Sequence, residues 1–347
     1  MSDIFVDFTH VARRASGIER VTKGLFSAHA LAPLPVKPIY ASGSSRLKLV
    51  LAQCLKLPAV ALANAKSVFI FPGYPPSFFF PIDRVRTILY VHDVFLLTRR
   101  NDLNRAARYY MAPQFSRALR EGRTFYCNSE DTERKLRPLI DSRARTLLFR
   151  PAIDNVFGLS AGDRVSRPSE LPVLKIVAVG TVEPRKNFRA GARICAALAR
   201  QLRRPVEYHV IGRRGWGSEW DAVAAQGNAV LHGYLDEEQA RRVIEDADAV
   251  LCTSHEEGLG LPLLELQYAG LAVIAPDAPV FHEVLGNSGI FIDVEATEDA
   301  ASRIAGAFTD GWRDRFAKAA AVNLARWNGQ AASDRERVIA HLRDLAA

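Results

Sequence analysis

The stretch AVLCTSHEEGLGLPLLELQYAG, residues 249–270, carries the pattern that decides the fold. Its first six residues form a short apolar run, which is typical of a buried strand. HEEGLGLP follows with two glycines and a proline, which predict a loop, and LLELQYAG has the apolar spacing of a helix. A strand, a loop and a helix in this order form one unit of a parallel sheet that is covered by helices.

The same unit recurs along the chain. We expect strands at DIFVDFT, SVFIFPG, TILYVHD and TFYCNS in the first half, and at LKIVAVG, VEYHVIG, NAVLHGY, AVIAPD and GIFID in the second. Helices separate most of them. Two helices open with capping-box spacing, from Ser16 to Glu19 and from Asp236 to Gln239, and a third has Ser129 as its N-cap. The alternation predicts an α/β fold with two doubly wound, Rossmann-like domains in tandem.

A chain of 347 residues is long enough for about two domains. The composition changes over residues 151–172, which are rich in Pro, Gly, Ser and Asp and show no periodicity. We therefore predict a first domain over residues 1–160, a linker over 161–172 and a second domain over 173–329. The tail reads as one more helix, and we expect residues 330–347 to join the first domain.

The composition is that of a globular protein, with 48% hydrophobic and 24% charged residues. No apolar run reaches the roughly 20 residues that span a bilayer. The first ten residues, MSDIFVDFTH, lack the pattern of a signal peptide. The four cysteines are scattered without a CxxC motif, which argues against a disulfide framework or a zinc site. We therefore expect a cytoplasmic protein.

The basic residues are concentrated in the first half of the chain. Residues 1–165 contain 25 Lys and Arg against 13 Asp and Glu, a net charge of +12, and the remaining residues have 21 against 25, a net charge of −4. A basic half favours an anionic partner, and a solvated Arg-rich surface is the alternative. For a membrane contact we favour four arginines near Tyr109 and Tyr110, namely Arg99, Arg100, Arg105 and Arg108. Packing of Tyr109–Phe115 in the core or between domains is the alternative for these aromatic residues.

The first loop with candidate chemistry is VGTVEPRKNFRAGARI, residues 179–194. A strand ends at Gly180, and Arg185 and Lys186 precede a helix that we expect to start near Asn187. A helix N-terminus presents free N–H groups and a positive dipole, and two added cations would make a diphosphate site. Two exposed cations in a polar turn are the alternative. Because cations at this end oppose the dipole, we expect an anion to offset them.

The second loop is the one quoted at the outset. Its two glycines, Gly258 and Gly260, allow a ligand to approach the backbone closely, and Pro262 suits a first helical turn. Glu265 is expected inside that turn, where a carboxylate could hold the diol of a ribose. Glu257 lies before the glycines. A helix start with favourable acidic residues is the alternative.

Two features of the first half also follow expected strands. Gly17, in SGIERV, opens a helix and could allow close approach of a phosphate or a sugar. His92 and Asp93 stand at the carboxyl end of the strand TILYV, where doubly wound sheets bind ligands. A structural histidine in a turn is the alternative reading of His92.

Together these loops resemble the retaining glycosyltransferases of family 4, of the bacterial surface-polysaccharide type. That family carries the motif E-G-F-G-L-P-x-x-E, which here runs from Glu257 to Glu265 with Leu259 in place of Phe. It also carries G-x-x-x-P-R-K-N, here Gly180 to Asn187, and SGIERV is similar to its TGIxRV. The resemblance is dense over residues 174–285 and weaker over 1–26 and 86–132. It implies the glycosyltransferase-B fold, with a cleft between the domains.

The resemblance also implies roles for individual residues. Arg185 and Lys186 would neutralise the leaving diphosphate, Glu257 would contact the donor sugar, and His92 would lie near that sugar. Glu265 would hold the ribose, Gly233 and Tyr234 would lie beside the base, and Gly17 would face the diphosphate from the other domain. The donor-binding residues implied in this way are Gly17, Gly180, Thr181, Gly233, Tyr234, Gly258, Leu259, Gly260, Leu261 and Glu265.

We therefore expect a retaining, metal-independent hexosyltransferase that needs no cofactor. The donor would be a nucleoside-diphosphate sugar; a GDP-mannose-like donor is favoured and UDP-sugars stay open. The acceptor would be a glycan or a polyprenyl-diphosphate-linked glycan, and the protein could lie peripherally at the inner face of the cell membrane. A nucleotide-sugar epimerase or a phosphorylase on the same fold is the alternative. No nucleic-acid motif is present, so we expect no nucleic-acid partner.

Overall fold

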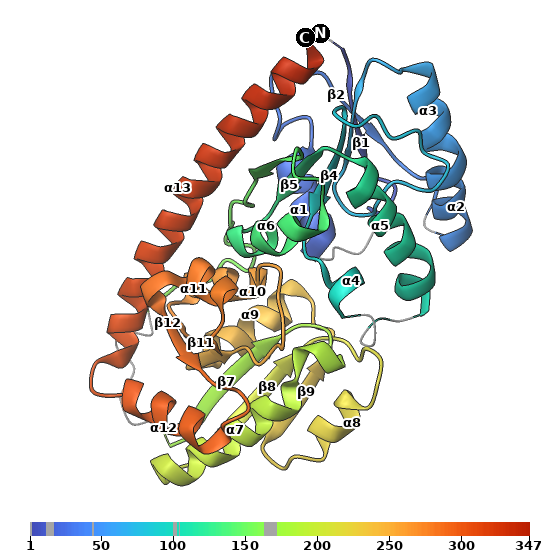
Figure 1. The fold of residues 1–347 in the computed structure, drawn as a ribbon. Coiled ribbons are helices and arrows are strands. Elements are labelled where there is room, and N and C mark those ends of the chain that lie inside the picture. The colour runs from blue at the N-terminus through green and yellow to red at the C-terminus, as the bar shows by residue number, and fades with distance from the viewer. Residues whose placement is uncertain (1, 12–16, 44, 100–102, 104, 163–171) are drawn as a thin grey trace. The chain divides into compact units, whose positions relative to one another are not determined.

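The computed structural model describes the chain except for residues 1, 12–16, 44, 100–102, 104 and 163–171 (Figure 1). It divides into two compact units, one formed by residues 1–152 and 328–347 and the other by residues 153–327. Most of the predicted linker over 161–172 lies outside the described residues, as does Ser16 of the first predicted capping box. Each unit contains one parallel sheet of six strands, so the prediction of two Rossmann-like domains in tandem is confirmed.

The first unit has the strand order β2-β1-β3-β4-β5-β6, and every neighbouring pair is parallel. Its strands are β1 (Ile4–Asp7), β2 (Val36–Ile39), β3 (Val68–Phe71), β4 (Thr87–Val91), β5 (Thr124–Cys127) and β6 (Arg145–Leu148). Its helical segments are α1 (Gly17–Phe26), α2 (Arg46–Leu51), η1 (Ala52–Lys56), α3 (Leu57–Ala63), α4 (Phe95–Thr98), η3 (Ala107–Met111), α5 (Ala112–Glu121), α6 (Glu130–Leu136) and η4 (Arg137–Leu139). The edge strands β2 and β6 are absent from the sequence prediction.

The second unit has the strand order β12-β11-β10-β7-β8-β9, again parallel throughout. Its strands are β7 (Leu174–Val179), β8 (Val206–Ile211), β9 (Ala229–Gly233), β10 (Ala249–Leu251), β11 (Ala272–Pro276) and β12 (Gly289–Ile292). Its helical segments are η5 (Pro184–Lys186), α7 (Phe188–Leu202), α8 (Glu219–Ala224), α9 (Glu237–Asp246), α10 (Leu261–Glu265), η6 (Leu266–Ala269), α11 (Pro279–Leu285), η7 (Gly286–Ser288) and α12 (Thr297–Ala307).

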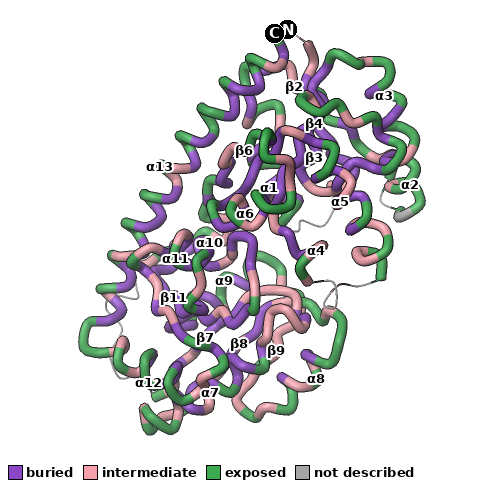
Figure 2. Tube along the Cα trace, viewed as in Figure 1, coloured by how far each residue is buried: buried purple, intermediate pink, exposed green. Residues whose placement is uncertain are grey.

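Alternating side chains of the strands build a core on both faces of the second sheet. In β7, Ile176 and Ala178 pack into one hydrophobic cluster, and Val177 between them packs into the other. This is the period of two that a strand imposes, and it explains why a strand covered on both faces reads as a continuous apolar run. Figure 2 shows the resulting buried strands.

Two predicted helix starts have the expected caps. Ser129 Oγ accepts from the backbone N–H of Thr132 at the start of α6. At the start of α9, Asp236 accepts from the backbone N–H of Gln239, and the Gln239 side chain accepts from the backbone N–H of Asp236. Each capping bond satisfies a donor that the helix itself leaves unpaired.

The last helix, α13 (Trp312–Ala346), has residues in both units. Its C-terminal part is fixed to the first unit by buried polar contacts. Arg150 Nη1 lies 2.9 Å from Asp334 Oδ2, and Tyr126 Oη lies 2.9 Å from His341 Nδ1. Because both groups of the ion pair are almost fully buried, removal of one would leave an uncompensated charge. Within the described residues, none of the helices combines the length and the apolar composition that crossing a bilayer requires.

Candidate functional site

The second sheet reverses its strand order between β7 and β10. From β7 the chain adds β8 and β9 on one side, and then returns to place β10 on the other side of β7. Ligands of doubly wound sheets bind beyond the carboxyl ends of the strands at this point of reversal. The loops that follow β7 and β10 are the two whose chemistry stood out in the sequence, so the topology brings them side by side.

The loop after β7 carries the two predicted cations on a short 3₁₀ turn. Pro184–Lys186 form η5, and Asn187 adopts a left-handed conformation with φ 50° before α7 begins at Phe188. Asparagine tolerates this conformation better than most residues. Arg185 and Lys186 therefore lie immediately before a helix N-terminus, as the sequence predicts.

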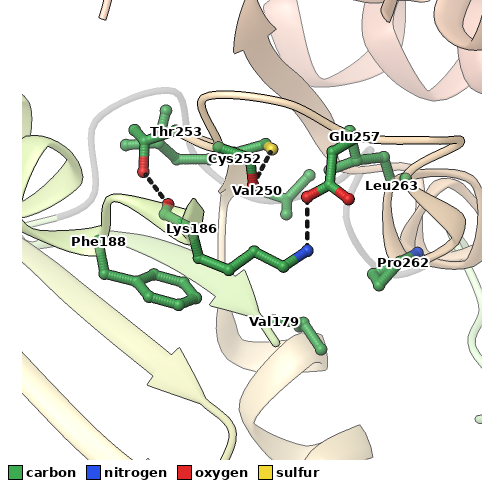
Figure 3. Close-up of a pocket in the computed structure, with 12 residues that line it drawn as sticks. Val179, Lys186, Phe188, Val250, Cys252, Thr253, Glu257, Pro262 and Leu263 are labelled. Carbon is green, nitrogen blue, oxygen red and sulfur yellow. Dashed lines mark hydrogen bonds and ion pairs between the residues drawn. The ribbon is translucent and has the colours of Figure 1, made fainter. Parts of the chain in front are cut away.

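Both cations contact Glu257 on the loop after β10. Lys186 Nζ lies 2.5 Å from Glu257 Oε1, and Arg185 Nη1 lies 3.2 Å from Glu257 Oε2 (Figure 3). Arg185 also donates to the carbonyl of Glu256 at 2.8 Å and to Glu183 Oε1 at 2.9 Å. The anion expected to offset the cations is thus supplied, at least in part, by the protein's own Glu257 and Glu183.

The environment of Glu257 keeps it ionised. Burial on its own raises the pKa of this carboxyl, but the charges of Lys186 and Arg185 outweigh burial and lower the pKa to about 2. The side chain of Lys186 is only 16% exposed. The alternative of two exposed cations in a polar turn is therefore wrong, because the Arg185 side chain is also only 18% exposed and both cations contact the carboxylate of Glu257.

Backbone contacts hold the two loops against each other. Thr253 Oγ1 donates to the carbonyl of Asn187 at 2.8 Å, and the backbone N–H of His255 donates to the carbonyl of Arg185 at 2.9 Å. A small pocket lies between the loops, and Figure 3 shows Lys186 and Glu257 meeting across it. The residues lining it are Val179, Lys186, Phe188, Val250, Leu251, Cys252, Thr253, Ser254, Glu257, Gly260, Pro262 and Leu263.

The glycine-rich turn after Glu257 is shaped by one backbone position. Gly260 has φ 81° and precedes α10 as its N-cap, a conformation that L-residues rarely adopt. Leu259 is buried in the hydrophobic core, so its side chain packs inwards and only its backbone could meet a ligand. Leu261 begins α10 and Pro262 follows in its first turn, as expected.

Glu265 does not lie in the first turn of this helix. Because α10 begins at Leu261 and has five residues, Glu265 is its last residue, and a short 3₁₀ segment continues from it. The side chain is buried, at 7% exposure, and is not among the residues that line the pocket. The dipole argument from the sequence therefore does not apply to Glu265, and its contact with a ribose stays a prediction.

Glycines let the loops after β7 and β8 approach each other closely. A Cβ on Gly212 would lie 1.8 Å from the carbonyl oxygen of Gly180, and one on Gly215 would lie 2.9 Å from Thr181 Cγ2. Gly180 itself lies beside Lys186, since a Cβ there would be 3.5 Å from Lys186 Cε. Sequence reasoning missed Gly212 and Gly215, although the run GRRGWG after an expected strand could have indicated them.

The predicted base-binding residues lie at the end of β9. Gly233 closes the strand with φ 72°, and its carbonyl accepts from the backbone N–H of Gly212 at 2.9 Å. Tyr234 follows with 74% of its side chain exposed. An exposed aromatic ring at the carboxyl edge of the sheet is available for stacking on a base.

Gly17 and His92 belong to the first unit. Gly17 begins α1, and His92 follows β4. His92 Nε2 lies 2.7 Å from the carbonyl of Pro72, which can only accept, so this nitrogen carries the proton. Burial lowers the pKa of His92 to about 4, although the same carbonyl raises it. His92 is therefore a neutral imidazole at neutral pH, and its Nδ1 is an acceptor.

The segment after β4 only partly follows its prediction. Phe115 is buried in the core of the first unit, but Tyr109 is 73% exposed, so Tyr109 does not pack in that core. Arg100, one of the four predicted membrane contacts, lies outside the described residues.

Comparison with known proteins identifies a matching family, related sequences and a similar structure. Residues 163–322 match the family model described as glycosyl transferases group 1. The chain is 24% identical over 273 residues to O-antigen chain mannosyltransferase B of Escherichia coli, covering 74% of this chain and 69% of that protein. It is 29% identical over 136 residues to the serotype-specific mannosyltransferase WbdA of Escherichia coli, covering 37% of this chain but only 16% of that protein. Sucrose-phosphate synthase from Thermosynechococcus elongatus has a similar fold, with a TM-score of 0.73 at 14% identity over 99% of both chains.

Two doubly wound units, with cationic and acidic loops at the point of strand reversal in the second, define a protein of the glycosyltransferase-B fold. Residues 163–322 match a glycosyl transferases group 1 domain, and glycosyl transfer is the enzyme activity that the comparisons support for this chain.

Proposed function

We propose that the protein transfers mannose from GDP-mannose, or a closely related hexose donor, to a glycan or lipid-linked glycan with retention of anomeric configuration. The observation that carries this proposal is the cluster of Arg185, Lys186 and Glu257 at the strand reversal of the second sheet. The first two are the cations that a departing diphosphate requires.

The charges in this cluster match those that develop in glycosyl transfer. Breaking the bond between the anomeric carbon and the phosphate oxygen leaves negative charge on the diphosphate. The Arg185 guanidinium offers a fork of donors, and Lys186 offers a compact charge beside it. Glu257, ionised at every physiological pH, fixes both cations in place. Pre-placed charge of this kind is usually the largest contribution to catalysis.

Our assignment of the donor's sugar and base is supported by the relatives. Both curated relatives described above are named as mannosyltransferases, and the motif pair PRKN and GIERV resembles enzymes that use GDP-sugars. Glu265 is assigned to the ribose, Glu257 to the donor sugar, and Gly233 with Tyr234 to the base. Gly180, Thr181 and the backbone of Gly258–Leu261 would surround the diphosphate.

We assign two further properties to the reaction. Transfer is metal-independent, because Arg185 and Lys186 supply the positive charge that a divalent cation would otherwise bring. It follows front-face substitution, which retains the anomeric configuration. Full activity in excess EDTA tests the first property, and the proton coupling of the product's anomeric hydrogen, measured by NMR, tests the second.

Equilibrium binding and a donor screen test the proposed function directly. We expect calorimetry to show that GDP binds at least tenfold more tightly than UDP, and we expect GDP-mannose to be the best donor in a screen of labelled nucleotide-sugars. A preference for UDP with turnover of a UDP-sugar would replace the donor and keep the enzyme class. A chain that binds no nucleoside diphosphate, while it unfolds cooperatively, would overturn the proposed function.

A further inference from the structure

The exposed hydrophobic side chains of this protein are concentrated in one part of the first unit. Among the described residues, eight of the sixteen large hydrophobic side chains that are exposed fall between residues 40 and 79. Single exposed apolar residues are normal on a soluble protein, whereas a local concentration marks an interaction surface. Scattered exposed residues would need no explanation, but this local concentration of exposed hydrophobic side chains does.

Four exposed leucines recur at helical spacing in this region. Leu47, Leu51, Leu55 and Leu62 lie on the consecutive helical segments α2, η1 and α3, at intervals of four, four and seven residues, and each is between 45% and 72% exposed. Such intervals place side chains on one side of a helix. The opposite side is buried and includes Leu57 and Ala61. We call the four leucines the leucine ridge; α2 and α3, which carry it, follow one another in Figure 1.

Two phenylalanines are presented next to this helix. Ser77 Oγ donates to the carbonyl of Gln53 on η1 at 2.7 Å, which ties the following loop to the ridge-bearing segment. Arg117 fixes the same loop, with Nη1 donating to the carbonyls of Ser77 and Phe78 at 2.9 and 2.8 Å. Phe78 and Phe79 nevertheless remain more than half exposed. The backbone is held while the aromatic side chains face solvent.

The stretch of sequence that carries the ridge has charges of one sign. The sequence has no Asp or Glu between Glu19 and Asp83, yet that stretch contains seven Lys and Arg. Lys48 and Lys56 lie on the ridge-bearing helix, and neither forms an ion pair with a carboxylate within the described residues. Lys56 Nζ instead donates to the carbonyl of Tyr40 at 2.9 Å. An aliphatic ridge flanked by unneutralised lysines complements the apolar interior and the anionic headgroups of a lipid leaflet.

A cavity lies beside the ridge. It has a volume of about 670 Å³ and is lined by Val50 and Gln53 of the ridge-bearing helix and by Arg105 and Tyr110 of the segment after β4. The Gln53 amide is buried, and its Nε2 has no hydrogen-bond partner among the described residues. A mostly apolar cavity with a few convergent polar groups is typical of a ligand site, and a buried donor without a partner favours a ligand with oxygen acceptors.

We propose that the leucine ridge, together with Phe78 and Phe79, docks the protein on an anionic lipid bilayer. Docking brings the adjacent cavity to the bilayer surface, where the phosphate and sugar oxygens of a lipid-borne acceptor would meet Gln53 and Arg105. This second step rests on the proposed function, and the docking itself does not. The surface also differs from the one expected from the sequence, which was centred on Arg99, Arg100, Arg105 and Arg108.

Vesicle co-sedimentation of the full chain tests the docking. We expect binding to vesicles of phosphatidylcholine with phosphatidylglycerol, and at least tenfold weaker partitioning to vesicles of phosphatidylcholine alone. A variant with Leu47→Ser, Leu51→Ser and Leu55→Ser should lower partitioning at least tenfold, and so should Lys48→Glu with Lys56→Glu. The matched control is Val322→Ser, which removes an equally exposed apolar side chain from α13 and should bind as the unaltered chain does.

Three results would overturn the docking surface. The first is no binding to the anionic vesicles. The second is a leucine variant that partitions like the control. The third is loss of binding on changing Arg99, Arg105 and Arg108 to Gln while the leucine variant binds normally. Nucleotide calorimetry on each variant separates the two proposals, because the ridge does not contribute to the donor site. Vesicle binding without nucleotide binding contradicts only the proposed function, and the reverse contradicts only the docking.

Discussion

Lys186 Nζ lies 2.5 Å from Glu257 Oε1, so a cation on the loop after β7 meets a carboxylate on the loop after β10. The two strands are neighbours on either side of the point where the sheet order reverses. One ion pair therefore links the two loops that carry the site. It should influence both the chemistry of the site and the stability of the domain.

Replacing Lys186 with Met should reduce both the catalytic rate and the stability of the domain. Loss of the ammonium group removes a charge from the leaving diphosphate, and we expect kcat to fall at least a hundredfold, or about 3 kcal/mol in transition-state stabilisation. We also expect the free energy of unfolding to fall by about 1–2 kcal/mol, because the buried Glu257 loses its shortest contact. Transfer assays and urea unfolding measure the two effects.

Lys175→Met is the matched control for this variant. Lys175 also contacts a carboxylate at 2.5 Å, that of Asp246, but this pair lies at the surface. Exposed pairs contribute little to stability, so we expect activity and unfolding close to those of the unaltered chain. A Lys186→Met enzyme with normal turnover would remove Lys186 from the mechanism, whatever its stability.

The charge of Glu257 should stabilise the domain over the whole physiological pH range. Because the folded pKa is lowered from 4.5 to about 2, the contribution is fully present above pH 4.5 and is lost as the pH falls towards 2. Its size is about 3 kcal/mol. We expect Glu257→Gln to lower the free energy of unfolding by this order at pH 7 and by less at pH 3.5, measured by urea unfolding. Equal losses at both pH values would contradict the ion-pair origin, and the exposed Glu238→Gln serves as control.

The two carboxylates of the motif, Glu257 and Glu265, should differ in binding experiments. Glu265→Gln should weaken the affinity for the bare nucleoside diphosphate at least tenfold, because the buried carboxylate is assigned to the ribose. Glu257→Gln should change that affinity less and reduce the transfer rate more, because it is assigned to the donor sugar. Calorimetry and initial rates distinguish the two residues, and equal losses of affinity would show that this division of roles is wrong.

The sequence predicted the strands that are covered on both faces, because each reads as an apolar run with turn residues at its end. It did not indicate the edge strand β2, since Pro38 lies within that strand and proline is typical of turns. Pro38 is accommodated because β2 pairs only with β1 and leaves its other edge without a partner in the sheet.

Prediction of the site from the sequence had similar limits. Spacing identified Arg185, Lys186 and Glu257, but their mutual contacts depend on the strand order, which a single sequence does not reveal. The helix start before Glu265 was misplaced by two residues, because helix boundaries depend on capping geometry that composition does not reveal. The leucine ridge escaped notice for a different reason: an apolar stripe looks the same in a sequence whether it faces a core or solvent.

His92 should affect the stability of the protein at acidic pH and leave its stability at neutral pH unchanged. Burial lowers the folded pKa from 6.5 to about 4, so the unfolded chain binds the proton first and stability is lost as the pH falls from 6.5 towards 4. His92→Gln keeps a donor for the Pro72 carbonyl and cannot take up a proton. We expect its free energy of unfolding, measured with urea, to change less between pH 7 and pH 4.5 than that of the unaltered chain, by about 2–3 kcal/mol at most.

The exposed His29→Gln is the control for that comparison. His10 and His341, whose pKa values burial also lowers to about 4, account for a slope that remains. If His92→Gln retains the full acid sensitivity, the imidazole takes up its proton as readily in the folded protein as in the unfolded chain, and the lowered pKa of His92 is wrong.

Asp7, the last residue of β1, should have the opposite effect. It is buried, and although the backbone N–H of Thr9 donates to its Oδ1 at 2.8 Å, burial outweighs hydrogen bonding and raises the pKa to about 6. A raised carboxyl pKa contributes stability that is fully present below the unfolded value of 3.8 and is lost as the pH rises through 6. Asp7→Asn keeps the acceptor and removes the buried charge. We therefore expect it to raise the free energy of unfolding by about 3 kcal/mol at pH 8 and to change it little at pH 4. If Asp7→Asn instead destabilises the protein at both pH values, its surroundings stabilise the ionised carboxylate. Its burial then does not lower the stability of the fold at neutral pH.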